Sequence, residues 1–314
     1  MEVNINNKTH SDSDKSNESQ KPHETLLQGT LLQGIGGFYT ALADDGVEYT
    51  LRARKKIRRD TAPFAGDRIE LTPGEGERHG WLESILPRRS VLTRPPTANL
   101  ELLILVIAPK PEPDLLLIDR LAVIARRAGI DCVLCINKSD IDPALGIQTA
   151  EEYALSGMPV LPVCALDPST LVELCALMSN KLCCMAGQSG VGKSTILNTL
   201  MSRTLKTGSI SERTKHGRHT TRQVDLLIDG DLRILDTPGF SLLALEDVPS
   251  AEVCDDYPEF DGVSARCRFQ PCMHDKEPDC AVTAALENSP AFARLARYRL
   301  LLAEARESER NKYR

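Results

Sequence analysis

The chain has 314 residues, of which 41% are hydrophobic and 26% charged, the balance of a soluble globular protein with room for two or three domains. Its longest apolar runs, such as 102–108, are as long as a buried strand and far short of the roughly 18 residues that suggest a membrane span. Ten cysteines without an export signal indicate a reducing compartment. We therefore expect a cytoplasmic protein with no membrane partner.

The net charge of -6 is spread unevenly along the chain. Two basic runs, at 52–59 and 203–222, contain Glu212 as their one acidic residue, while acidic residues concentrate in the N-terminal tail and between 246 and 279. Because a local basic surface is enough to attract phosphate groups, the net charge does not exclude a nucleic-acid partner.

Residues 1–24 are polar and predict a disordered tail. Between 25 and 97, short alternating segments near 37–43, 48–54, 67–71 and 80–86 are separated by Gly, Asp-Asp-Gly and Pro-Gly. About five short strands in this length predict a small β-barrel of the OB type.

From 98 to 243 the pattern changes to apolar strands separated by helices, which predicts a mostly parallel sheet covered on both faces. We expect strands at 101–108, 132–137, 159–165, 182–186, 224–228 and 232–235. One helix runs from an Asp114 cap to Gly129, and another begins with Thr170 and Glu173 in the spacing of a capping box. The pair Asp229-Gly230 predicts a hairpin, so the last two strands should be antiparallel.

Residues 244–314 form a third, small module in this interpretation. The segment is acidic, carries cysteines and prolines, and ends in a helical pattern at 292–306, with apolar residues at 295, 298, 301 and 302. The predicted fold class is therefore multidomain α/β.

The strongest motif is Gly187-Gln-Ser-Gly-Val-Gly-Lys193-Ser194, which follows a predicted strand and opens a helix. Its glycines let backbone N–H groups surround phosphates at a helix N-terminus. Lys193 would bridge the β- and γ-phosphates, and Ser194 would bind Mg²⁺. The alternative is a glycine-rich turn that contains Lys-Ser by chance.

A phosphate loop does not distinguish ATP from GTP, so the base must be recognised elsewhere. The strand at 132–136 ends in Asn137-Lys138-Ser139-Asp140, the N-K-x-D pattern of GTPases. The Asp140 carboxylate could accept two hydrogen bonds from guanine, whereas adenine would present the wrong groups to it.

Two further segments fit the phosphate end of a GTPase. Asp236-Thr-Pro-Gly239 follows a predicted strand, so Asp236 would hold Mg²⁺ and the Gly239 N–H would contact the γ-phosphate. Residues 217–222 suit a mobile switch loop, in which either Thr220 or Thr221 would bind Mg²⁺. The basic residues around this loop are either a solvated face or a sensor of phosphate backbone.

The order of these motifs is permuted, because N-K-x-D precedes the phosphate loop. A parallel sheet tolerates this where the original chain ends lie close together. The loop after Gly239 then leads into the C-terminal module, which hydrolysis would move directly.

The sequence Cys267-x4-Cys272-x-His274-x5-Cys280 offers three thiolates and one imidazole, enough for a closed, structural Zn²⁺ site. The spacing departs from the common C-x2-C, and free thiols are the alternative. A short module with few apolar residues favours the metal. The other seven cysteines are expected to pack as small hydrophobes.

Taken together, these motifs resemble the ribosome small-subunit-dependent GTPase family RsgA, from about Gln28 onward. The resemblance also rests on the barrel segments 66–68 and 86–94 and on Gly217-Arg-His-Thr-Thr221. It implies an OB barrel at 25–97, a circularly permuted GTPase domain at 98–243 and a zinc-binding module at 244–314. It further implies late maturation of the small subunit, rRNA binding, and GTP turnover stimulated by that subunit. We expect a monomer with one structural Zn²⁺ and with Mg²⁺ bound beside GTP.

The motifs and the resemblance assign GTP binding to Asn137, Lys138, Ser139, Asp140, Ala165, Gly187, Gln188, Ser189, Gly190, Val191, Gly192, Lys193, Ser194, Thr195 and Gly239. Phe240 stands where many GTPases have a glutamine that orients water, and its ring cannot hydrogen-bond. The family assigns this role to a switch-loop histidine, which maps onto His219; the alternative is that His219 contacts RNA. Cys164 replaces the usual serine of the base-side loop, where the Ala165 N–H could still reach the guanine oxygen.

Two rival functions remain at this stage. An RNA chaperone with an OB barrel and a zinc module would keep its nucleotide without hydrolysing it. A P-loop ATPase or small-molecule kinase would bind adenine, which Asn137 and Asp140 argue against.

Overall fold

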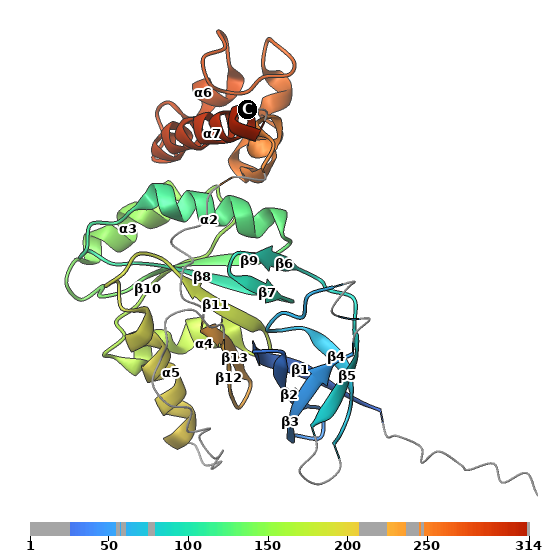
Figure 1. Cartoon of the computed structure of the whole chain (residues 1–314). Helices are drawn as coiled ribbons and strands as arrows, with labels where there is room; N and C mark the ends of the chain where they lie inside the picture. Colours follow the sequence, from blue (N-terminus) through green and yellow to red (C-terminus); the bar gives the residue numbers. More distant parts are fainter. Residues whose placement is uncertain are drawn as a thin grey trace, which may run out of the picture.

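The computed structural model describes residues 26–54, 57, 61–74, 79–206, 225–236, 245 and 248–312. A small barrel, a layered α/β domain and a C-terminal module follow one another along the chain (Figure 1). The barrel and the C-terminal module lie on different sides of the central domain, and the module rests against helix α2 (Leu115–Arg127).

The N-terminal body is a closed five-stranded barrel. Its strands are β1 (Leu27–Ile35), β2 (Phe38–Ala43), β3 (Glu48–Ala53), β4 (Arg68–Thr72) and β5 (Gly80–Ile85), in the order β1-β2-β3-β5-β4. Only β3 and β5 pair in parallel; the other neighbours are antiparallel. Alternate residues point inward, and Leu51, Ile69, Leu71 and Leu82 are fully buried. The barrel predicted from short alternating segments is confirmed.

A short hairpin that the sequence did not predict joins the barrel to the sheet. It consists of β6 (Val91–Thr93) and β7 (Pro96–Ala98). Leu92 from this hairpin and Leu32 from β1 pack into the core beneath α2. The barrel is therefore attached to the central domain by apolar packing as well as by the chain.

The central sheet has six strands in the order β10-β9-β8-β11-β13-β12. In chain order they are β8 (Leu102–Ile107), β9 (Asp131–Ile136), β10 (Val160–Pro162), β11 (Leu182–Ala186), β12 (Asp225–Asp229) and β13 (Leu232–Asp236). All neighbours are parallel except β12 and β13, which pair through the predicted hairpin. Every residue of β8 is buried, as a central parallel strand requires.

Helices cover both faces of this sheet. Helix α2 and α3 (Pro143–Glu152) pack on one face, and α4 (Val172–Met178) and α5 (Lys193–Lys206) on the other. The Asp114 side chain caps α2 by accepting from the Leu117 N–H at 2.9 Å, as predicted.

The capping box predicted at Thr170 and Glu173 is wrong. Thr170 lies inside a 3-10 turn, η1 (Pro168–Leu171), which Asp167 caps by accepting from the Ser169 N–H. The Thr170 hydroxyl instead accepts from the Cys164 N–H at 2.9 Å, and α4 begins only at Val172, without a side-chain cap.

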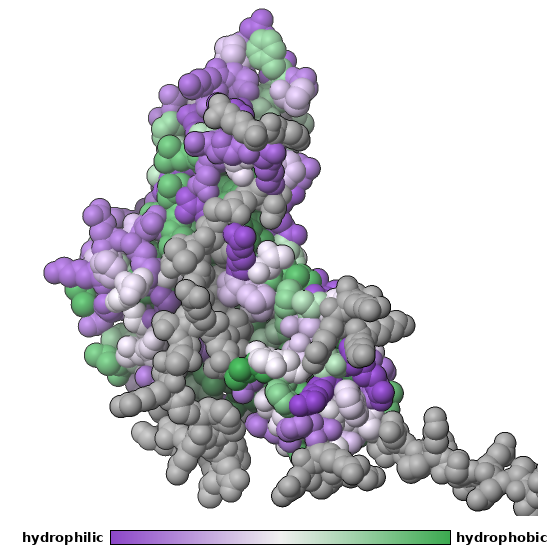
Figure 2. Space-filling view, in the orientation of Figure 1, coloured by the Kyte–Doolittle hydropathy of each residue, from purple (hydrophilic) through white to green (hydrophobic). Residues whose placement is uncertain are grey.

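The C-terminal module combines short turns with two helices. They are η3 (Ser250–Asp256), η4 (Pro258–Phe260), η5 (Ser264–Arg266), α6 (Ala281–Leu286) and α7 (Phe292–Lys312). The predicted apolar stripe of α7 forms the centre of the module core, with Leu295, Tyr298, Leu301 and Leu302 fully buried. Hydrophilic side chains cover much of the module's visible surface (Figure 2). Within the described residues, no helix is both long enough and apolar enough to cross a membrane.

Candidate functional site

The predicted nucleotide-binding loops meet at one edge of the sheet. Strands β8, β9 and β11 are parallel, so their carboxyl ends lie side by side. Strand β9 ends at Ile136, directly before Asn137, and β11 ends at Ala186, directly before Gly187. The two motifs therefore converge although their order in the chain is reversed.

The Asn137 side chain links three of these loops. Its Nδ2 donates to the Val191 carbonyl oxygen at 2.8 Å, and its Oδ1 accepts from the Ala165 N–H at 3.0 Å. Asn137 itself is 1% exposed. A buried amide with both ends satisfied holds the loops that follow β9, β10 and β11 in one arrangement.

Lys138 and Ser139 strengthen the same junction. The Lys138 Nζ donates to the carbonyl oxygens of Lys110 at 2.7 Å and Gly190 at 2.8 Å. The Ser139 N–H donates to the Val163 carbonyl oxygen at 3.1 Å. Asp140, at the end of this loop, is exposed and able to meet a ligand.

Two glycines of the phosphate loop are required by close contacts. A Cβ on Gly187 would lie 2.2 Å from the Val106 carbonyl oxygen, and one on Gly192 would lie 2.2 Å from the Asn137 Nδ2. Both have positive φ, at 138° and 98°. Only glycine can combine this backbone conformation with such close neighbours.

Helix α5 begins at Lys193, immediately after the loop. The Lys193 Nζ donates to the carbonyl oxygens of Gly187 and Gln188, both at 2.7 Å, and burial lowers the pKa of this amine. Ser194 and Thr195 are exposed in the first helical turn. The arrangement places a lysine, two hydroxyls and a helix N-terminus around one position, which suits an anion.

The sequence did not predict that Gln188 joins the phosphate loop to helix α2. Its Oε1 accepts from the Asp114 N–H at 3.0 Å, at the start of that helix. No sequence signal identifies this contact, because the two residues lie 74 positions apart.

The γ-phosphate side is described only in part. Asp236 ends β13, which pairs in parallel with β11, so this carboxylate lies at the same sheet edge as the phosphate loop. The predicted residues His219, Thr220, Thr221 and Gly239 lie outside the residues that the structure describes.

The four predicted metal ligands form a buried cluster in the C-terminal module. The Cys267 Sγ lies 3.9 Å from the Cys280 Sγ and 3.7 Å from the His274 Nδ1, which is 3.4 Å from the Cys280 Sγ. All four ligand atoms, including the Cys272 Sγ, lie within 4.8 Å of one another. Two sulfurs bound 2.3 Å from a tetrahedral Zn²⁺ are about 3.8 Å apart, so the cluster fits this ion.

Neighbouring groups hold these ligands in place. The Thr283 N–H donates to the Cys280 Sγ at 3.5 Å at the start of α6, and the Arg299 Nε donates to the His274 carbonyl oxygen at 3.0 Å. The Phe260 ring meets the His274 imidazole edge-on. By contrast, Cys135 is buried in the sheet, and burial raises the pKa of its thiol to about 12, which makes it unreactive.

The comparison with known proteins gives the family. The RsgA GTPase family matches residues 85–246. The small ribosomal subunit biogenesis GTPase RsgA of Caldanaerobacter subterraneus subsp. tengcongensis is 38% identical over 293 residues, which cover 91% of this chain and 98% of that relative. The chain belongs to the RsgA GTPase family.

Two solved structures agree with the family in fold. YjeQ from Thermotoga maritima superposes with a TM-score of 0.76 at 29% identity, covering 90% of this chain and 99% of the other. YloQ, described as a circularly permuted GTPase, gives a TM-score of 0.74 at 28% identity and covers 92% of this chain and 98% of the other. This RsgA GTPase is therefore an enzyme that hydrolyses GTP on a circularly permuted fold.

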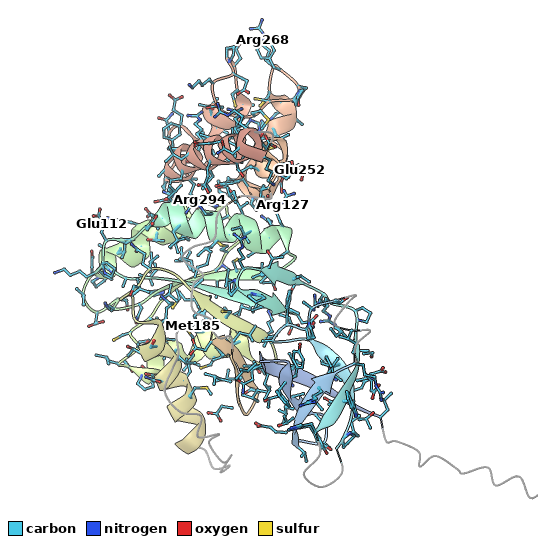
Figure 3. All side chains as sticks on the ribbon, in the orientation of Figure 1. Glu112, Arg127, Met185, Glu252, Arg268 and Arg294 are labelled. Atoms are coloured by element: carbon cyan, nitrogen blue, oxygen red, sulfur yellow. The ribbon has the colours of Figure 1, made fainter. Side chains whose placement is uncertain are left out.

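A buried ionic cluster that the sequence did not predict joins the central domain of this RsgA GTPase to the C-terminal module. Asp119 of α2 accepts hydrogen bonds from the Tyr153 hydroxyl at 2.9 Å, the Arg294 Nε at 3.2 Å and the Arg297 Nε at 2.5 Å. The Arg294 Nη1 also lies 3.0 Å from the Glu259 Oε1. Arg294 is buried where α7 meets α2 (Figure 3).

Two flanking arginines of α2 extend this junction. The Arg120 Nη2 lies 2.7 Å from the Glu304 Oε2, and Arg127 pairs with Glu252 and Asp256. Figure 3 shows Arg127 and Glu252 at the same boundary. Helix α2 thus contacts the C-terminal module of the RsgA GTPase through three groups of ion pairs, at Asp119, Arg120 and Arg127.

Proposed function

We propose that this RsgA GTPase couples GTP hydrolysis to the small ribosomal subunit, late in the maturation of that subunit. The observation that carries the proposal is the hydrogen bond from the Asn137 amide to the Val191 carbonyl oxygen, which joins the N-K-x-D loop to the phosphate loop. Because this bond holds the two loops side by side, one guanine nucleotide can contact both of them. We infer the partner, the small ribosomal subunit, from relatives whose names describe small ribosomal subunit biogenesis.

The nucleotide lies across the sheet edge in this proposal. Asp140 binds the guanine N–H groups, and the guanine oxygen lies toward the Ala165 N–H, which donates to the Asn137 Oδ1 at 3.0 Å in this structure. Loop residues 187–192 surround the phosphates with backbone N–H groups, and Lys193 neutralises their charge. Asn137 holds these loops in register and need not touch the ligand.

Magnesium fits the oxygen ligands that the site offers. Ser194 and Asp236 are the described residues that would hold it, together with Thr220 or Thr221. When bound, the ion neutralises charge that develops on the phosphates. His219 orients the attacking water, and the Gly239 N–H contacts the γ-phosphate. Turnover is slow until a partner orders the loop that carries His219.

The other two bodies bind rRNA in this proposal. The barrel supplies one surface, and the C-terminal module, held together by one Zn²⁺ on Cys267, Cys272, His274 and Cys280, supplies the second. The nucleotide state positions both, and hydrolysis releases the protein from the subunit. The protein acts as a monomer in the cytoplasm.

Phosphate release measured with and without purified small subunits tests the proposal. Small subunits should raise the rate for the wild type, whereas Ser194→Ala and His219→Ala should respond weakly. A wild-type rate that small subunits leave unchanged would favour an RNA chaperone that keeps its nucleotide. Binding of ADP as tight as that of GDP would favour an ATPase or kinase instead.

A further inference from the structure

A row of exposed side chains crosses three neighbouring strands of the barrel. Phe38 on β2 pairs with Arg52 on β3, and Arg52 pairs with Trp81 on β5. Phe38 is 37% exposed and Trp81 is 42% exposed, while their inward-facing neighbours Leu51 and Leu82 are fully buried. Two aromatic rings and a guanidinium group therefore share one outer face of the barrel.

The groups of this row contact one another. The guanidinium carbon of Arg52 lies 4.6 Å from the centre of the Phe38 ring, and that of Arg54 lies 5.3 Å from the Trp81 ring. His79 meets the Phe38 ring edge-on, with the ring centres 4.9 Å apart. Contacts of this kind hold the aromatic rings in place before any ligand arrives.

The charges on this face favour a polyanion. Arg54 is paired with Glu83 at 2.5 Å, but among the described residues no carboxylate forms an ion pair with Arg52. Arg52 also begins the basic run of the sequence, which continues to Arg59 without an acidic residue. A protein partner with an apolar surface would leave the Arg52 charge desolvated without a counter-ion, whereas a phosphate backbone supplies one.

The spacing of the rings suits unpaired bases. Strands β2 and β5 flank β3, so Phe38 and Trp81 stand two strand spacings apart, roughly 10 Å. Two bases of a single strand can each lie on one ring, with their phosphates near Arg52. A duplex would keep its bases stacked inside and present only its backbone.

We propose that Phe38, Arg52 and Trp81 form a stacking platform for two unpaired bases of ribosomal RNA. This rests on the proposed function, in which the barrel binds rRNA, and it names the surface and the structural state of the RNA. The platform binds unpaired bases with little sequence preference, because every base has a face that can stack on an aromatic ring.

The chain contains one tryptophan, Trp81, so its intrinsic fluorescence reports directly on the platform. The full-length protein should be titrated with an unstructured single-stranded RNA of about twelve nucleotides, a duplex RNA of the same length, and heparin as a polyanion without bases. Single-stranded RNA should quench Trp81, while duplex RNA and heparin should bind with little quenching. Single-stranded RNA that binds without changing the fluorescence of Trp81 would overturn the proposal.

Variants provide a second, independent measurement. Phe38→Ala should weaken binding of single-stranded RNA by about tenfold, measured by anisotropy of labelled RNA. Val47→Ala removes a similarly exposed apolar side chain from the turn between β2 and β3 and should bind like the wild type. Equal affinities of Phe38→Ala and Val47→Ala would contradict the platform.

The two proposals can fail separately. Quenching by single-stranded RNA without stimulation of GTPase activity by small subunits would retain the platform and reject the proposed function. Stimulation of the wild type without quenching would reject the platform alone.

Discussion

The Asn137 side chain donates a 2.8 Å hydrogen bond to the Val191 carbonyl oxygen, across 54 residues of sequence. This contact makes the arrangement of the nucleotide site dependent on one amide, because the same side chain also accepts from the Ala165 N–H.

Replacing Asn137 with alanine should weaken GDP binding by about 5- to 100-fold. The change removes two buried hydrogen bonds, each worth about 0.5–1.5 kcal/mol, and leaves the Ala165 N–H without its partner. Isothermal titration calorimetry with GDP measures the effect. Asn198→Ala, an exposed substitution on α5, is the matched control and should bind GDP normally.

Asp140→Asn should change the preferred base from guanine to xanthine. The carboxylate accepts from two N–H groups of guanine, whereas an amide can donate to the second carbonyl of xanthine. Competition of XDP and GDP for a fluorescent nucleotide compares the two affinities. Asp142→Asn, two residues on at the cap of α3, should keep the guanine preference. If both variants still prefer GDP, Asp140 does not read the base.

Removal of metal should unfold the C-terminal module and spare the nucleotide site. Three thiols and an imidazole packed within 4.8 Å can hold one metal ion, and removing that ion would leave them without the bonds that fix their arrangement. Elemental analysis should find about one zinc per chain in the wild type and much less in Cys272→Ser. After treatment with a chelator, trypsin should cleave the module while GDP binding persists. A wild-type protein purified without metal, with a module that resists trypsin, would contradict the zinc proposal.

Asp119→Ala should destabilise the protein by about 3–5 kcal/mol, because it leaves the buried Arg294 and Arg297 without their shared carboxylate. Chemical denaturation followed by circular dichroism measures the change. Arg268→Ala provides the comparison, since Arg268 pairs with Asp279 at the exposed tip of the module (Figure 3). That exposed pair should contribute less than about 1 kcal/mol. Similar losses for both variants would mean that the buried cluster is not what holds the module.

Glu259→Gln should make the protein more stable at neutral pH. Burial raises the pKa of Glu259 above its ordinary value of 4.5, and its oxygens accept no aligned hydrogen bond within the described residues. Three carboxylates, Asp119, Glu152 and Glu259, face the two guanidinium groups of Arg294 and Arg297. Because the Glu259 side chain is buried, its charged form lowers the stability of the folded protein relative to its neutral form.

The sign of the pH dependence follows from the raised pKa. The folded protein holds the Glu259 proton more tightly than the unfolded chain does, so this contribution to stability is complete below pH 4.5 and is lost as the pH rises through the folded pKa. Glu259→Gln should remove that loss, and thermal unfolding between pH 4.5 and 8 measures it. Glu287→Gln, an exposed change after α6, should keep the wild-type profile. A Glu259→Gln variant that is less stable at pH 8 would show that the Arg294 pair outweighs burial.

The elements with regular spacing were predictable from the sequence. Strand β11 and the helix capped by Asp114 have the predicted bounds to within two residues, because an apolar run and a cap each depend on local chemistry. The β6–β7 hairpin was missed because its strands have three residues each, and β7 begins with a proline. The capping box at Thr170 failed because its hydroxyl accepts instead from the Cys164 N–H in the loop before the helix.

The convergence of the nucleotide loops was predictable from motifs, but their internal support was not. The N-K-x-D and phosphate loops come together as the motifs require, whereas the Gln188 contact with α2 depends on the fold. The same applies to Asp119 and Arg294, which are 175 residues apart. An aspartate within the apolar run of α2 was the one available hint, and its partner could not be named from sequence.

Helix α2 touches both the phosphate loop and the C-terminal module. At its cap, the Asp114 N–H donates to the Gln188 Oε1 of the phosphate loop. Further along, Asp119, Arg120 and Arg127 form ion pairs with the C-terminal module. If this 13-residue helix moves as a rigid rod, a small tilt at the phosphate loop would give a larger displacement at its far end. The module is therefore joined to the phosphate loop through α2 as well as through the chain, and these contacts would remain if the backbone were cut after Asp236.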